Sequence, residues 1–173
     1  MIVFLSGLSG VGKTTTAKAF VARHAQFKHV IASCLISRAG ARTQPLDSAD
    51  VKRNQEVLLR EFAAIRRSFP EYYILLDGHM VIETTQGEEI VGDEVIDGLA
   101  ATHFIAIIDD PRRIYSTRQH DLDRASLSLG ELERLQDLEI VTTRRQAERR
   151  ECPFFEVQSG EVEALELIFG LRG

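Results

Sequence analysis

The chain has 173 residues, of which 44% are hydrophobic and 27% are charged, and its formal net charge is −5. This length and apolar share are enough for one sizeable core, so we expect a single domain over residues 1–173. The negative charge argues against DNA or RNA as a partner, and the absence of a membrane-spanning run or a signal peptide predicts a cytoplasmic protein without membrane contacts.

Short strands and helices are predicted to alternate along the chain. In order, strands are expected at 2–5, 29–32, 72–76, 104–108 and 154–157, and helices near 13–25, 48–69, 93–100, 111–119, 130–150 and 161–169. The strands at 72–76 and 104–108 are apolar throughout, as in strands covered on both faces. The alternation predicts an α/β fold with helices on both faces of a parallel sheet.

The first predicted strand leads into GLSGVGKTT, residues 7–15. This stretch contains the phosphate-binding signature G-x-x-x-x-G-K-[ST], ending in Gly12, Lys13 and Thr14, between a strand and a helix as the mechanism requires. Glycines let the backbone N–H groups approach phosphate oxygens, and the helix adds the positive end of its dipole. The sequence therefore predicts that this loop binds the phosphates of a nucleotide.

ATP and Mg²⁺ are the expected cofactors of this loop. Lys13 is expected to reach the β- and γ-phosphates, and the Thr14 hydroxyl to ligate Mg²⁺. The other expected nucleotide contacts come from Gly7, Ser9, Gly10, Val11, Gly12 and Thr15.

Polar groups also follow the other predicted strands, at the end of a parallel sheet where ligands bind. Ser33 follows the second strand, and Asp77-Gly78-His79 ends the third. We expect these groups to converge on one rim with the phosphate loop. The polar, glycine-containing segment 82–92 predicts a surface loop or a small hairpin.

Two further patterns have structural interpretations. A near-helical stripe indicates helix packing and consists of Leu132, Leu135, Leu138 and Val141. Cys34 and Cys152 lie far apart and lack metal-ligand spacing, which predicts two reduced, buried thiols.

In their order along the chain, these motifs resemble those of nucleoside monophosphate kinases. The resemblance rests on the N-terminal phosphate loop and on HVIASCLISR, LLDGH, IAIIDDPRRIYSTRQ and TTRRQAERR. It is closest to archaeal-type adenylate kinases, in which the third strand ends in Asp-x-His-x-x-Ile, matched by Asp77, His79 and Ile82. It implies a P-loop NTPase fold with a five-stranded parallel sheet, an acceptor-binding insertion near 33–70 and a short helical lid near 119–143.

The resemblance also implies roles for single residues. Ser33 falls beside the acceptor base, and Arg38 falls where an arginine grips the acceptor phosphate, a task suited to a planar, permanently charged fork. Asp77 is implied to lie near Mg²⁺ or to orient the acceptor. His79 is implied to contact the acceptor.

Arginines must neutralise the transferred phosphate, and nine of them with no lysine lie between Arg112 and Arg150. Most are interpreted as members of ion pairs on helix faces. The resemblance singles out Arg118 before the lid and Arg144 or Arg145 after it, with Arg124 within the lid as the next candidate. The expected catalytic set is therefore Lys13, Asp77, Arg118 and Arg144.

The chain departs from the commoner bacterial pattern. That pattern continues after Asp-Gly with an aromatic residue, proline and arginine, where this chain has His79, Met80 and Val81. Cys34 and Leu35 replace a usual glycine and a frequent acid. We expect transfer of the γ-phosphate to a nucleoside monophosphate, AMP first, while the departures leave open another nucleoside monophosphate or a small hydroxylated or phosphorylated metabolite.

One alternative lies outside the kinases. The alternative is a P-loop ATPase or a nucleotide switch with a protein partner, because Asp77 is as well suited to activate water as to act in a kinase. The Asn-Lys-x-Asp motif that reads guanine is missing from the sequence. The sequence does not indicate an oligomeric state.

Overall fold

The computed structural model describes residues 1–44, 46–119 and 127–171. Its centre is a five-stranded parallel sheet in the order β2-β3-β1-β6-β7. The strands are β1 (Ile2–Ser6), β2 (Phe27–Ile31), β3 (Tyr73–Asp77), β6 (His103–Ile108) and β7 (Phe154–Gln158). The predicted five-stranded parallel sheet is confirmed, and each predicted strand bound lies within two residues of the observed one.

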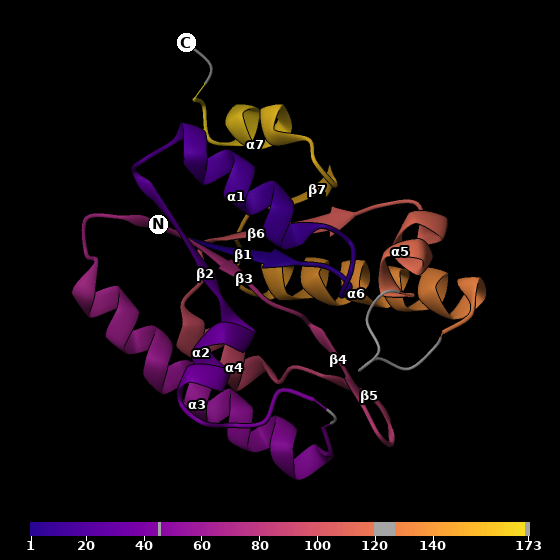
Figure 1. Cartoon of the computed structure of the whole chain (residues 1–173). Coiled ribbons are helices and arrows are strands. Elements are labelled where there is room, and N and C mark those ends of the chain that lie inside the picture. Colours follow the sequence, from indigo (N-terminus) through magenta and orange to yellow (C-terminus); the bar gives the residue numbers. More distant parts are fainter. Residues whose placement is uncertain (45, 120–126, 172–173) are drawn as a thin grey trace.

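Helices cover both faces of this sheet, as Figure 1 shows. Side chains alternate between two cores, so that Phe4 of β1 packs in one and Leu5 in the other. The helices are α1 (Lys13–Arg23), α2 (Ala32–Arg38), α3 (Ser48–Ser68), α4 (Asp93–Leu99), α5 (Pro111–Arg118), α6 (Leu129–Arg149) and α7 (Val162–Ile168). Burial on both faces explains why the central strands are apolar throughout.

Local sequence signals set the starts of the longer helices. Both α3 and α6 begin with a capping box, formed by Asp47 with Asp50 and by Ser128 with Glu131. Pro111 stands in the first turn of α5, where its missing N–H is harmless.

Helix α2 was not predicted. The second strand ends at Ile31, and the chain enters a seven-residue helix directly, so the prediction of a strand through Ala32 was one residue too long. Only Ala32 and Leu35 of this helix are buried, which is too few positions for a readable helical period. Ser33 consequently lies in the first turn of a helix.

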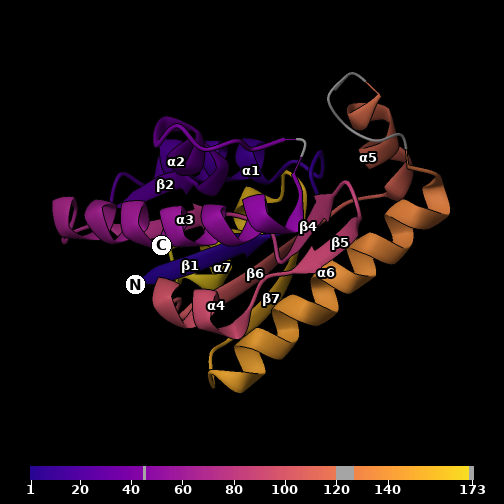
Figure 2. The same cartoon turned by 90° about the horizontal axis from the view of Figure 1, so that it is seen from below.

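The segment after β3 forms the predicted small hairpin. Strands β4 (Val81–Thr84) and β5 (Gly87–Ile90) pair antiparallel. The backbone N–H of Val91 donates to the carbonyl of Met80 and closes the base of the hairpin. Figure 2 shows α6 running along one side of the molecule, past this hairpin to α5.

Two sequence interpretations need correction. Leu132 and Leu135 are buried, but Val141 is 61% exposed. Further along α6, the buried side of the helix is formed by polar residues: Glu139, Thr142, Thr143 and Gln146. Cys34 is exposed on α2 and Cys152 is half-buried, so the predicted burial is wrong for Cys34, while both thiols are free as expected.

Part of the predicted lid, including Arg124, falls on residues 120–126, which lie outside the described residues. In the described part of the chain, every helix is too short or too polar to span a membrane.

Candidate active site

The phosphate loop adopts the glycine-dependent conformation that its sequence predicts. Gly7, Gly10 and Gly12 have φ values of 143°, 86° and 98°, in the region that favours glycine. A Cβ atom on Gly7 would lie 2.5 Å from the carbonyl oxygen of Ile107, and one on Gly12 would lie 2.2 Å from Ser159 Oγ. The positive φ values favour glycine at all three positions, and at Gly7 the backbone of β6 also leaves no room for a side chain.

Helix α1 starts inside this loop. Its N-cap is Gly12, and within this described stretch no side chain caps the helix and no acid lies in the first turn. The first N–H groups thus point outward without a side-chain acceptor, at the positive end of the helix dipole. This end of α1 is suited to an anion such as phosphate.

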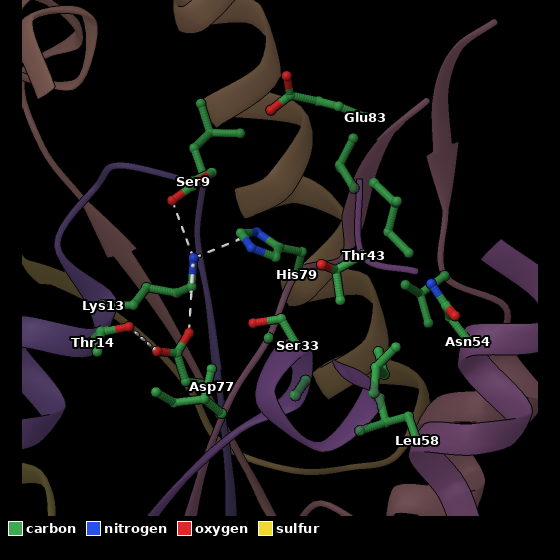
Figure 3. A pocket seen from close by; sticks show the side chains of 18 of the residues that line it. Ser9, Lys13, Thr14, Ser33, Thr43, Asn54, Leu58, Asp77, His79 and Glu83 are labelled. Atoms are coloured by element: carbon green, nitrogen blue, oxygen red, sulfur yellow. Dashed lines mark hydrogen bonds and ion pairs between the residues drawn. The ribbon is translucent and has the colours of Figure 1, made fainter. Parts of the chain in front are cut away.

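Lys13 is buried, with 6% of its side chain exposed. Its Nζ donates to the carbonyl oxygens of Gly7 at 2.6 Å and Leu8 at 3.1 Å. The same ammonium lies 3.4 Å from Nδ1 of His79, which must be the acceptor because an ammonium only donates, and 3.9 Å from Asp77 Oδ1. Figure 3 shows Lys13 between Asp77 and His79, among the side chains that line a cavity.

Asp77 is held as a carboxylate at the end of β3. The Thr14 hydroxyl donates to its Oδ2 at 2.6 Å, and His29 Nε2 lies 3.4 Å from the same oxygen. Burial alone would raise the pKa of Asp77. The hydrogen bond from His29, the charge of Lys13 and the hydrogen bond from Thr14 outweigh burial and hold that pKa below its ordinary value.

The two predicted Mg²⁺ ligands are therefore neighbours. A hydroxyl and a carboxylate are the hard oxygen donors that Mg²⁺ prefers, and this ion is usually held by one or two protein oxygens together with substrate phosphates and water. Thr14 and Asp77 fit such a site. The described residues contain no cluster of three or more His, Cys, Asp or Glu side chains that would hold a metal by itself.

A cavity of about 680 Å³ begins at the phosphate loop and continues between α2 and α3 on one side and the β4–β5 hairpin and α4 on the other. Its phosphate end is lined by Ser9, Gly10, Gly12, Lys13, Thr14 and Thr15. Ser33, Asp77 and His79 line it as well. The structure thus brings together the predicted loop, the end of β3 and the start of α2.

The other end of the cavity, here called the acceptor end, has a largely apolar wall with several uncharged hydrogen-bonding side chains set into it. Hydrogen-bonding side chains there come from Ser33, Thr43, Gln44, Asn54 and Gln55, and apolar ones include Leu58, Ile82, Val95 and Leu99. Among the described residues that line the cavity, there is no arginine, and Lys13 is the only lysine. Glu83 adds an acid at the rim. The acceptor end is suited to neutral hydroxyl groups more than to a second phosphate.

Two predicted arginines lie away from this cavity. Arg38 is exposed in the last turn of α2 and does not line the cavity. Arg144 donates from Nη2 to Glu156 of β7 at 2.5 Å, and its guanidinium lies 5.2 Å from the ring centre of Phe154. Its neighbour Arg145 pairs with Asp93 at 3.8 Å. Arg144 and Arg145 are positioned as members of surface ion pairs.

Arg118 is the predicted arginine that reaches the site. It is buried, and its Nη1 and Nη2 donate to the two carboxylate oxygens of Glu83 at 2.7 and 2.6 Å. Its stem packs on the phosphate loop, since a Cβ on Gly10 would lie 3.0 Å from Arg118 Cγ. The guanidinium is therefore beside the loop but bound by an acid of the cavity rim.

Sequence reasoning missed three residues of the site: His29, Asn54 and Glu139. Asn54 carried a readable signal, because it is the polar position on an otherwise apolar face of α3 with Val51 and Leu58. Its Nδ2 donates to the carbonyl of Arg42 at 2.7 Å, which holds the segment before α3 over the cavity. His29 and Glu139 had no such signal, because each acts through contacts with residues far away along the chain.

Comparisons with known proteins agree with the fold. The model of the AAA domain family matches residues 6–136, and no curated protein matches the chain. Shikimate kinase from Acinetobacter baumannii in complex with shikimate has a similar structure, with a TM-score of 0.67 at 15% identity over 98% of this chain and 93% of that one. The tunicamycin resistance protein of Deinococcus radiodurans gives 0.61 at 15% identity over 99% and 96%.

A sugar kinase from Janibacter sp. HTCC2649 has a TM-score of 0.58 at 15% identity, over 98% of this chain and 94% of that one. At this identity, the structural likeness establishes the fold. Because the family model covers more than half of the residues, the chain belongs to the AAA domain family, and it has the fold of the P-loop kinases.

Proposed function

We propose that the chain is an ATP-dependent kinase that transfers the γ-phosphate to a hydroxyl group of a small, neutral, polar metabolite. The observation that carries this proposal is one continuous cavity, which joins the phosphate loop to an acceptor end that combines an apolar wall with uncharged hydrogen-bonding side chains. Cavities of several hundred cubic ångströms are typical of small-molecule sites.

Binding of the triphosphate begins with Lys13. Its ammonium now satisfies the carbonyls of Gly7 and Leu8, and a triphosphate would offer it more strongly charged acceptors in the same loop. The N–H groups at the start of α1 would hold the remaining phosphate oxygens. Mg²⁺, held beside Thr14 and Asp77, would add positive charge against the oxygens that become more negative during transfer.

Transfer then depends on positioning, because phosphoryl transfer leaves little covalent chemistry to the protein. His79 stands between Lys13 and the acceptor end, where it would contact the acceptor hydroxyl. Ser33, Thr43 and Asn54 would orient that acceptor, while the apolar wall keeps water from the γ-phosphate. The products are ADP, a phosphorylated metabolite and the proton that the acceptor hydroxyl releases.

The similar structures support this substrate class. Two of them are a shikimate kinase bound to shikimate and a sugar kinase, both kinases named for small molecules. Their low identity gives no residue-level assignment for this chain, so the substrate class rests on the composition of the cavity wall.

A nucleoside monophosphate kinase with AMP as the acceptor is the second candidate. It is supported by the Asp77, His79 and Ile82 pattern and by the order of motifs along the chain. It requires an arginine such as Arg38 to move into the cavity, because the described wall offers no arginine for an acceptor phosphate. An ATPase or switch is the third candidate, in which Asp77 would face water.

ADP formation from MgATP with a panel of acceptors tests these candidates. We expect ADP release to rise about 100-fold or more with one shikimate-like, sugar or polyol acceptor, and to stay at the basal rate with AMP, CMP, UMP and GMP. Lys13→Ala is the control for contaminating activity. Stimulation by a nucleoside monophosphate alone would replace the proposal with the second candidate, and a high rate that ignores every acceptor would establish an ATPase.

A further inference from the structure

Glu139 is a buried acid that the proposed reaction does not use. It lies in the middle of α6, and 1% of the residue is exposed. A carboxylate at such a site needs hydrogen-bond donors, since an unpaired buried charge is strongly destabilising.

Three backbone N–H groups supply these donors. Glu139 Oε1 accepts from Gly7 at 3.0 Å and from Met80 at 2.7 Å, and Oε2 accepts from Val81 at 2.7 Å. Gly7 opens the phosphate loop, while Met80 and Val81 directly follow His79. One carboxylate therefore joins helix α6 to the nucleotide end of the cavity and to the loop that carries His79.

The helix is fixed to the sheet at the same point. Thr143 Oγ1 lies 2.6 Å from the carbonyl oxygen of Glu139 and 2.7 Å from Ser6 Oγ, at the last residue of β1. Burial raises the pKa of Glu139, against the opposing effects of the N–H donors and of the Lys13 charge. The glutamate thus has little freedom to move independently of the two loops.

The contacts require a carboxylate. Both oxygens accept from backbone N–H groups, and the carboxylate is the form of this side chain that only accepts hydrogen bonds. A glutamine would turn its NH₂ group toward at least one backbone N–H and leave that pair without a hydrogen bond.

We propose that Glu139 is a positioning residue that transmits occupancy of the phosphate loop to the His79 loop and to α6. It touches neither of the proposed reactants. A displacement of Gly7 when phosphate enters the loop would be passed to Met80 and Val81 through one side chain. The effect on turnover rests on the proposed kinase function, whereas the coupling itself requires only that a nucleotide binds.

Hydrogen exchange with MgADP as the probe tests the coupling without any acceptor. In the wild type, we expect MgADP to slow exchange in the segment 79–82 about tenfold. In Glu139→Gln this slowing is expected to be lost, while the phosphate loop itself is still protected by MgADP. Glu133→Gln is the matched control, because it removes an exposed acid from the same helix, and it should behave like the wild type.

A second variant keeps the proposal testable if Glu139→Gln does not fold. Glu139→Asp keeps the charge but is one methylene shorter, so it should not span both loops and should lose the same protection. Undiminished nucleotide-dependent protection at 79–82 in a folded Glu139 variant, or its absence in the wild type, would overturn the proposal.

Turnover gives an independent readout. We expect Glu139→Gln to lower kcat about tenfold to 100-fold, in line with the loss of hydrogen bonds to a charged group, with less than a threefold change in KM for ATP. A purely structural role would lower Tm and the active fraction without losing the exchange response, and that result would contradict the proposal. If MgADP protects 79–82 but no acceptor is phosphorylated, only the proposed function fails.

Discussion

The two ends of the cavity are built in different ways. The phosphate end comes from nine consecutive residues, 7–15, whose glycines, lysine and threonine act where they stand in the sequence. The acceptor end is assembled from α2, α3, the β4–β5 hairpin and α4, which are separated along the chain. A contiguous motif thus reveals the nucleotide end, while the acceptor end becomes readable only after folding.

The ends also differ in charge. Lys13 and the ionised Asp77 give the phosphate end buried charges of both signs, whereas the described acceptor wall is mostly neutral. Two buried acids show that burial alone does not decide the direction in which a pKa shifts. Hydrogen bonds and a cation lower the pKa of Asp77, while burial dominates at Glu139 and raises its pKa.

Lys13→Ala should produce the largest loss. Phosphate transfer is expected to fall roughly a thousandfold, because under the proposed function this buried ammonium would neutralise the transferred group. Lys13→Met keeps much of the buried stem and controls for packing. Steady-state ADP formation measures the loss, and circular dichroism checks the fold. Near-normal turnover in a folded variant would show that the phosphate loop is not the catalytic end.

Asn54→Ala should affect the opposite end. We expect the KM for the acceptor to rise about tenfold and the KM for ATP to change less than twofold, since Asn54 lines the acceptor end and fixes the Arg42 carbonyl. Initial rates with each substrate varied in turn provide the test. Equal increases in both KM values would mean that the two ends are not separate.

Asp77 should make folding stability sensitive to acid. The pKa of Asp77 is lower in the folded than in the unfolded protein. Its carboxylate therefore adds to the free energy of unfolding above about pH 4, and this stabilisation is lost as the pH falls through the folded pKa. Urea unfolding between pH 6 and pH 3 should show a smaller loss of stability in Asp77→Asn than in the wild type. The same slope in both proteins would contradict the assignment.

Arg38→Ala should have the smallest effect. The side chain is exposed and outside the cavity, so both KM values are expected to stay within about twofold of the wild type. Arg42→Ala, at another exposed arginine before α3, is the matched control. A selective tenfold rise in the acceptor KM for Arg38→Ala would favour the nucleoside monophosphate candidate.

The sequence was sufficient for features set by local pattern. The alternation of strands and helices and the glycine-dependent conformation of the phosphate loop follow from short stretches of chain. Helix α2 was missed because two buried positions do not define a period.

Long-range contacts could not be predicted. Glu139 lies 132 residues from Gly7 along the chain, and Arg118 lies 35 residues from Glu83. A resemblance assigns an arginine to a position in a motif but does not say which acid binds it. For this reason Arg38, Arg118 and Arg144 were all predicted to be site residues from the sequence. In the structure, Arg118 lies beside the phosphate loop, whereas Arg38 and Arg144 lie outside the cavity.

The most direct test of the central claim is calorimetry with Mg²⁺ and a non-hydrolysable ATP analogue. We expect the wild type to bind the analogue at one site, formed by residues 7–15. In Lys13→Ala, the affinity should fall at least about 100-fold, or binding should be lost. Absence of binding to the wild type, or equal binding by both proteins, would contradict the account.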